Sequence, residues 1–166
     1  MARVLFVTRE DITSRTPIGG NVDSDKYMSF VYDVQEIHLQ SIIGTQLLEK
    51  LYTDITGSTL TGKYETLVNT YIKPFVSFYA VGEYMAFANF SINNGGVYAH
   101  ESENSVAATR ADVNALSQQL IDKAEHWGRR MYDYLSANVS DFPEWNEYQT
   151  GDMPKYGDST RVSWVL

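Results

Sequence analysis

The 166-residue sequence contains no cysteine. This absence excludes thiolate catalysis, zinc sites built from cysteine and a disulfide-stabilised scaffold. Basic side chains are also scarce, since 13 Lys and Arg stand against 21 Asp and Glu, for a formal net charge of −8. A protein that wraps a phosphate backbone needs clustered Lys and Arg, so the composition argues against that class of function.

Long apolar runs are nearly absent as well. The apolar run near the N-terminus is too short for a signal peptide. The most hydrophobic stretch, residues 75–92, carries Glu83 in its middle. A charge at that depth in a bilayer costs roughly 2.5–3.5 kcal/mol. The stretch therefore predicts a buried core helix, and no association with a membrane is expected.

Aromatic residues are plentiful, with 12 Tyr, 7 Phe and 3 Trp. Tyrosine is common in protein interfaces, where its ring packs and its hydroxyl finds a partner. With 43% hydrophobic residues, the chain is long enough to bury a core of its own. Composition therefore favours a protein–protein interaction module.

Hydrophobic periodicity predicts an all-α fold, an antiparallel bundle of about four helices. Asp23 or Ser24 is expected to cap the first helix. Ile42-Ile43-Gly44 predicts a break between the first two helices, and Pro74 predicts either a kink or a new start within the third. The expected helices span residues 25–39, 45–56, 61–92 and 109–135.

Both ends of the chain have the alternation of short strands, at residues 3–8 and 161–166. Asn93-Asn94-Gly95-Gly96 is a turn signal that is consistent with a short hairpin. Three regions are therefore expected: residues 1–22 as a strand and loop arm, 23–140 as the helical domain, and 141–166 as an extended acidic and aromatic arm.

One motif resembles a nucleotide-binding loop. Gly57 to Lys63 fits G-x-x-x-x-G-K, but Tyr64 stands where Ser or Thr should contact magnesium. The preceding residues have helical spacing, whereas such a loop follows a buried strand. The segment is therefore predicted to be a loop between two helices, without nucleotide binding.

No catalytic or metal-binding pattern stands out, and no enzyme activity, cofactor or metal is expected. His38, His100 and His126 lack the spacing of metal ligands. Glu83 is the one acid on an apolar helix, and an Arg from the last long helix is its expected partner. The arginines available there are Arg110, Arg129 and Arg130.

The C-terminal aromatic side chains are flanked by Pro, Gly and Asp, so docking on a neighbouring protein is as plausible as packing on their own chain. These side chains and the two apolar residues that end the chain are the candidate interaction residues: Trp145, Tyr148, Tyr156, Trp164, Val165 and Leu166.

Three blocks of sequence resemble a known family. They are Asp25-Lys26-Tyr27 with Val34-Gln35-Glu36-Ile37 and residues 42–51; Tyr71-Ile72-Lys73-Pro74 with residues 93–97; and residues 134–138 with Phe142-Pro143. Across roughly residues 10–145 the chain is similar to the helical head–tail connector (adaptor or head-completion) proteins of tailed bacteriophages, especially those that infect Bacteroidetes.

This resemblance implies a homo-oligomeric ring, usually of about twelve copies, in the neck of the virion. The ring would dock on the portal protein, extend the DNA channel and present a surface to the tail or the next neck ring. Assembly would take place in the host cytoplasm. A negatively charged wall lets DNA pass without specific binding, which agrees with the net charge of −8.

Three other functions remain open from the sequence. The chain is also compatible with another virion structural role, such as a tail-completion or scaffolding protein. A small helical enzyme that uses Glu83 is a second alternative, and it requires a solvent-reachable pocket at that residue. The third is a cytoplasmic regulator that binds partners through the C-terminal aromatic residues.

Overall fold

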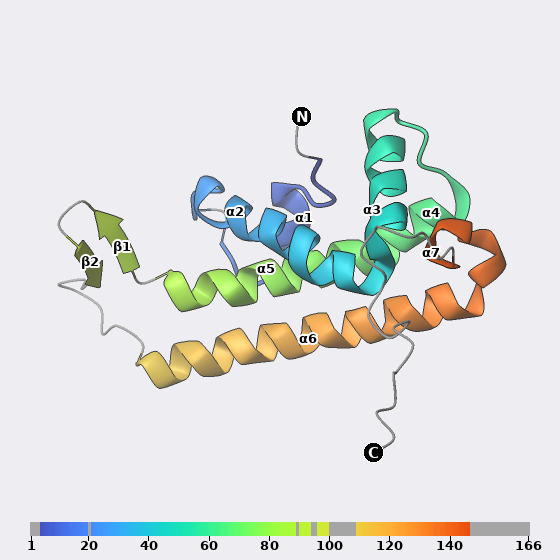
Figure 1. The fold of residues 1–166 in the computed structure, drawn as a ribbon. Coiled ribbons are helices and arrows are strands. Elements are labelled where there is room, and N and C mark those ends of the chain that lie inside the picture. The colour runs from blue at the N-terminus through green and yellow to red at the C-terminus, as the bar shows by residue number, and fades with distance from the viewer. Residues whose placement is uncertain (1–3, 20, 89, 94–95, 100–108, 147–166) are drawn as a thin grey trace, which may run out of the picture.

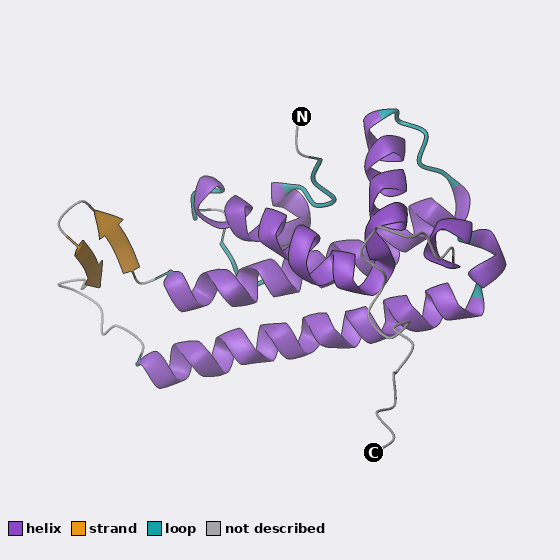
Figure 2. Cartoon of the chain, viewed as in Figure 1, coloured by secondary structure: helices purple, strands orange, loops and turns teal. Residues whose placement is uncertain are grey.

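Helices make up nearly all of the regular structure (Figure 2), which confirms the predicted all-α fold. The computed structural model describes residues 4–19, 21–88, 90–93, 96–99 and 109–146. Within these residues, no helix combines the length and the apolar character needed to cross a bilayer. The elements are α1 (Arg9–Arg15), α2 (Asp25–Asp33), η1 (Val34–Leu39), α3 (Gln40–Thr56), α4 (Gly62–Thr66), η2 (Leu67–Ile72), α5 (Lys73–Phe87), β1 (Phe90–Asn93), β2 (Gly96–Ala99), α6 (Arg110–Ala137), η3 (Val139–Asp141) and α7 (Pro143–Asn146).

The antiparallel helices α5 and α6 form the base on which the other helices lie (Figure 1). They approach closely at Gly82, whose carbonyl accepts a 2.7 Å hydrogen bond from the Ser117 hydroxyl. A Cβ at Gly82 would stand only 2.9 Å from Cγ1 of Ile121. Glycine is therefore required for this helix contact. The apolar face of α5 is buried as predicted for this stretch.

Gly44 redirects the chain within α3. Its φ of 77° and ψ of 162° are not helical, and this region of φ favours glycine. The second half of α3 consequently rises away from α6 (Figure 1). The predicted break at residues 42–44 is confirmed, and Gly57 ends the helix as expected.

Two π-helical stretches, η1 and η2, widen the helices near the centre of the fold. At their ends the Gln40 N–H bonds the Gln35 carbonyl, and the Lys73 N–H bonds the Val68 carbonyl, five residues back in each case. The second stretch leads directly to Pro74, which has no N–H to donate. Pro74 thus lies in the first turn of α5, directly after a widened turn.

The N-terminal segment is packed into the core, so the predicted strand and loop arm over residues 1–22 is wrong. Residues 4–8 form no strand, and α1 follows at Arg9. Phe6 and Ile12 are buried. The backbone here is bonded by the side chain of Gln35 rather than by a neighbouring strand.

The long third helix ends earlier than its apolar pattern indicates. It was expected to reach Ile92, but α5 ends at Phe87 because β1 and β2 form an antiparallel hairpin. Asn93 pairs with Gly96 in this hairpin, as the turn signal predicted.

The helical core extends beyond the predicted boundary at residue 140. Phe142 and Trp145, which fall in the region expected to be an arm, are buried. The side chain of Phe142 packs edge-on against the ring of Tyr64, with 5.1 Å between the ring centroids. The predicted strand at 161–166 lies outside the described residues.

Candidate functional site

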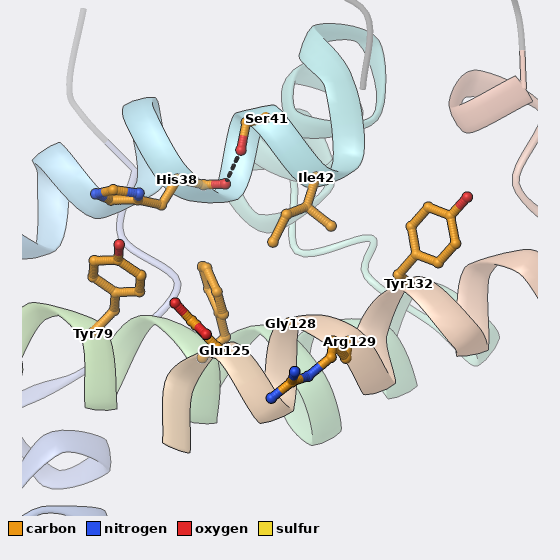
Figure 3. Close-up of a pocket in the computed structure, with 9 residues that line it drawn as sticks. His38, Ser41, Ile42, Tyr79, Glu125, Gly128, Arg129 and Tyr132 are labelled. Carbon is orange, nitrogen blue, oxygen red and sulfur yellow. Dashed lines mark hydrogen bonds between the residues drawn. The ribbon is translucent and has the colours of Figure 1, made fainter. Parts of the chain in front are cut away.

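A groove of about 460 Å³ lies between the helices η1 and α3 on one side and the α5–α6 base on the other (Figure 3). Ile42 projects into it from α3, and Tyr132 rises from α6 at one end. Its walls mix aromatic, apolar and charged side chains: His38, Ser41, Ile42, Phe75, Tyr79, Glu125, Gly128, Arg129 and Tyr132.

The floor of the groove depends on Gly128. A Cβ at this position would lie 3.2 Å from Cε2 of Phe75 and 3.3 Å from Cδ1 of Ile42. Both distances are tighter than ordinary van der Waals contact. The missing side chain therefore lets the helices approach while leaving an apolar floor between them.

A histidine–carboxylate pair closes one end of the groove. The His38 Nε2 lies 3.1 Å from Oε1 of Glu83, and each side chain keeps roughly a third of its surface exposed (31% and 29%). The predicted pairing of Glu83 with Arg110, Arg129 or Arg130 is therefore wrong. The orientation of α5 turns Glu83 toward η1, where His38 is within reach.

Tyr79 supports this pair from below. Its ring stacks on the imidazole of His38 with 4.0 Å between centroids. Burial raises the pKa of Tyr79, and the negative charges of Glu83 and Glu125 raise it further. The phenol therefore stays neutral at physiological pH and acts here as a packing surface.

Trp145 contacts two residues that line the other end of the groove, Ile42 and Tyr132. Its indole Nε1 donates to the Ile42 carbonyl at 3.3 Å, and its ring packs edge-on against Tyr132 at 5.6 Å. Only 5% of its surface is exposed. Of the candidate interaction residues, Trp145 is thus packed on its own chain, while Tyr148, Tyr156, Trp164, Val165 and Leu166 lie outside the described residues.

The P-loop-like segment has the predicted place between two helices, α3 and α4. The ammonium group of Lys63 binds Asn138 and Asp141 and so ties α4 to the end of α6. His126 is exposed on α6, and His100 lies outside the described residues. Across the part of the chain that the structure describes, no three His, Asp or Glu side chains are placed to hold a metal ion.

The groove itself corresponds to no motif in the sequence. Gly128 lies on the buried face of α6 between Ala124 and Met131, and Gly44 follows the paired isoleucines of α3. These two glycines are the only sequence signals for it that we identify. The pairing of His38 with Glu83 joins residues 45 positions apart and left no such signal.

A family model matches residues 39–154, a range that includes every groove residue except His38. The comparison with curated proteins found no match, and neither did the comparison with solved structures. The chain belongs to the family described as "Family of unknown function (DUF6712)".

Proposed function

We propose that this chain is a structural protein of the tailed-phage neck, where it forms a ring that docks on the portal, extends the DNA channel and offers an attachment surface to the tail. A cyclic ring requires two different, complementary faces on each subunit. The observation that carries the proposal is the presence of separate exposed apolar side chains on α6.

Leu116 and Tyr132 are the two positions. Leu116 is 48% exposed near the start of α6, and Tyr132 is 42% exposed near its end. Sixteen residues separate them, which corresponds to about 24 Å along a helix. Phe87 is also exposed, at the end of α5 that faces the start of α6. Two distant apolar surfaces suit head-to-tail contacts between neighbouring subunits.

Charge supports the same proposal. Each subunit carries a formal charge of −8, so a closed ring would present a strongly negative wall. Such a wall repels the phosphate backbone and allows DNA to pass.

Imaging of the purified protein mixed with its cognate portal tests this function. We expect rings seated on the portal. Leu116→Lys should weaken ring formation, whereas Asn114→Lys adds the same charge on the opposite side of α6 and should not. The proposal would be contradicted if the protein stayed monomeric and did not bind the portal over a range of salt and protein concentrations. Rings found elsewhere in the particle would favour another virion structural role, such as tail completion.

The His38–Glu83 pair favours a second candidate function, a small helical enzyme. A carboxylate beside an imidazole at the end of an open groove is a geometry that general acid–base catalysis uses. Glu83→Gln would then abolish turnover on a panel of hydrolase substrates. Absence of turnover by the unaltered protein on the whole panel would count against this candidate.

A further inference from the structure

We propose that residues 147–158 dock into the groove of their own subunit, with the ring of Tyr148 over its apolar floor. The proposal goes beyond the neck function and does not depend on it. Two observations identify the occupant of the groove: the described chain ends beside the groove, and the side chains of residues 147–158 match the chemistry of the groove lining.

The described chain ends beside the groove, next to two of its lining residues. Trp145 is held there by the Ile42 carbonyl and by the ring of Tyr132, and both of these residues line the groove. Tyr148 follows three residues later, a separation that spans at most about 11 Å of extended chain. The segment therefore begins within reach of the site.

The floor suits an aromatic side chain. Phe75 and Ile42 supply apolar surface, and both pack closely against Gly128, which adds no side chain of its own to the floor. An amphipathic ring buries its carbons on such a floor while its hydroxyl stays near polar groups at the edge. A volume of about 460 Å³ leaves room for neighbouring residues of the segment as well.

The groove offers this occupant one cation, Arg129, which lines it together with the carboxylate of Glu125. Among the described residues, no carboxylate pairs with the guanidinium of Arg129, which lines the groove. Residues 147–158 carry three acidic side chains, beginning with Glu147, and a single lysine. Arginine binds carboxylates with strong, charge-assisted hydrogen bonds.

Residues 147–158 of the same subunit are favoured over those of a second copy because they are covalently joined to the chain beside the groove. A short tether gives an effective concentration in the millimolar range, which is far above the concentration of a free subunit in dilute solution. Docking within one chain is therefore expected whenever the segment is not held by a partner.

Crosslinking tests this proposal directly, because the chain has no cysteine of its own. Gln149→Cys is combined with Glu125→Cys, which faces the groove, or with Lys123→Cys, which lies on the opposite side of the same helix. With a short bis-maleimide at low protein concentration, the Glu125 pair should crosslink within the chain about 10-fold faster than the Lys123 pair. Circular dichroism verifies that both variants are folded.

When Tyr148→Ser is added to each cysteine pair, the faster crosslinking of the Glu125 pair should be mostly lost. Trp164→Ser lies outside the docking segment and should leave the difference between the two pairs unchanged. Equal crosslinking of the two cysteine pairs would overturn the proposal. Covalent dimers in place of internal crosslinks would also overturn it, since the occupant would then be a second copy. Ring assembly on the portal is measured separately, so failure here is distinguishable from failure of the neck function.

Discussion

The side-chain amide of Gln35 hydrogen-bonds the backbone of Phe6, whose N–H donates to the Gln35 Oε1 at 3.0 Å. The same amide donates from Nε2 to the Val4 carbonyl, also at 3.0 Å. One buried side chain thus takes the place of a neighbouring strand for the N-terminal segment. It bonds the backbone on either side of Leu5 and fixes the segment against η1.

Gln35→Leu should release this segment. The substitution leaves the buried N–H of Phe6 without a partner, which costs about 1–3 kcal/mol in unfolding free energy. Urea unfolding measures the loss, and the amide of Phe6 should exchange faster with deuterium. Gln118→Leu, on the exposed face of α6, is the control and should change neither measurement. Unaltered exchange at Phe6 would show that the segment is held by burial alone.

Gly82→Ala should destabilise the contact between α5 and α6. The new Cβ would stand 2.9 Å from Cγ1 of Ile121 and 3.2 Å from the Ser117 carbonyl. Overpacking of this kind costs about 1–3 kcal/mol. Thermal unfolding reports it, and Gly19→Ala, with nothing within 4 Å, is the matched control.

The same contact permits a rescue experiment. Ile121→Ala removes the nearest atom, so it should recover part of the loss caused by Gly82→Ala in a double-mutant cycle. If the losses in unfolding free energy of the two single variants are strictly additive, the clash of the new Cβ is with the Ser117 carbonyl rather than with Ile121.

Asp11 should contribute stability that depends on pH. Burial raises its pKa, but hydrogen bonds from the Thr8 backbone and hydroxyl and the ammonium group of Lys73 outweigh this effect, so the pKa lies below 3.8. A group with a lowered folded-state pKa stabilises above its unfolded value and loses that contribution as pH falls through the folded value. Asp11→Asn should therefore lower the melting temperature at neutral pH, and the difference should shrink as the pH falls through the lowered folded-state pKa. Asp133→Asn, an exposed acid, is the control; a difference that persists at low pH would contradict the assignment.

Truncation should locate the C-terminal limit of the core. A chain that ends at residue 146 keeps Phe142 and Trp145, so its stability should stay within about 1 kcal/mol of the full chain. A chain that ends at residue 140 loses both aromatic side chains, and burial of each is worth about 3–5 kcal/mol. Far-ultraviolet circular dichroism and urea unfolding distinguish the two, and equal stability would restore the boundary expected from the sequence.

Local patterns predicted the helices well and the ends of the chain poorly. Helical spacing, Gly44 and the turn after Asn93 depend on neighbouring residues, so the sequence contains the information. The prediction for the N-terminal segment failed because the apolar pattern that begins at Val4 is the same whether the backbone pairs with a strand or with the amide of Gln35. The C-terminal boundary failed because Pro143 begins a further short helix, α7, which packs on the core instead of leading the chain into solvent.

The candidate site was predictable only in part. Glu83 was singled out correctly as the unusual acid, but its partner depends on how α5 turns against η1, and no local pattern specifies that rotation. The groove arises where Gly128 meets Ile42 and Phe75, three residues from three helices. This contact depends on how the three helices pack against one another, which no local sequence pattern specifies.

The hydrogen bond between Trp145 and Ile42 also bears on the order in which the protein folds. It joins residues 103 positions apart, whereas the contact of Ser117 with Gly82 spans only 35. Closing the longer loop costs about 1 kcal/mol more in chain entropy. The paired helices α5 and α6 are therefore expected to form first and the contacts of Trp145 beside the groove last, an order that native-state hydrogen exchange can check by comparing α6 with α7. A nascent or partly folded subunit would then lack the finished groove, so whatever binds there meets only fully folded copies.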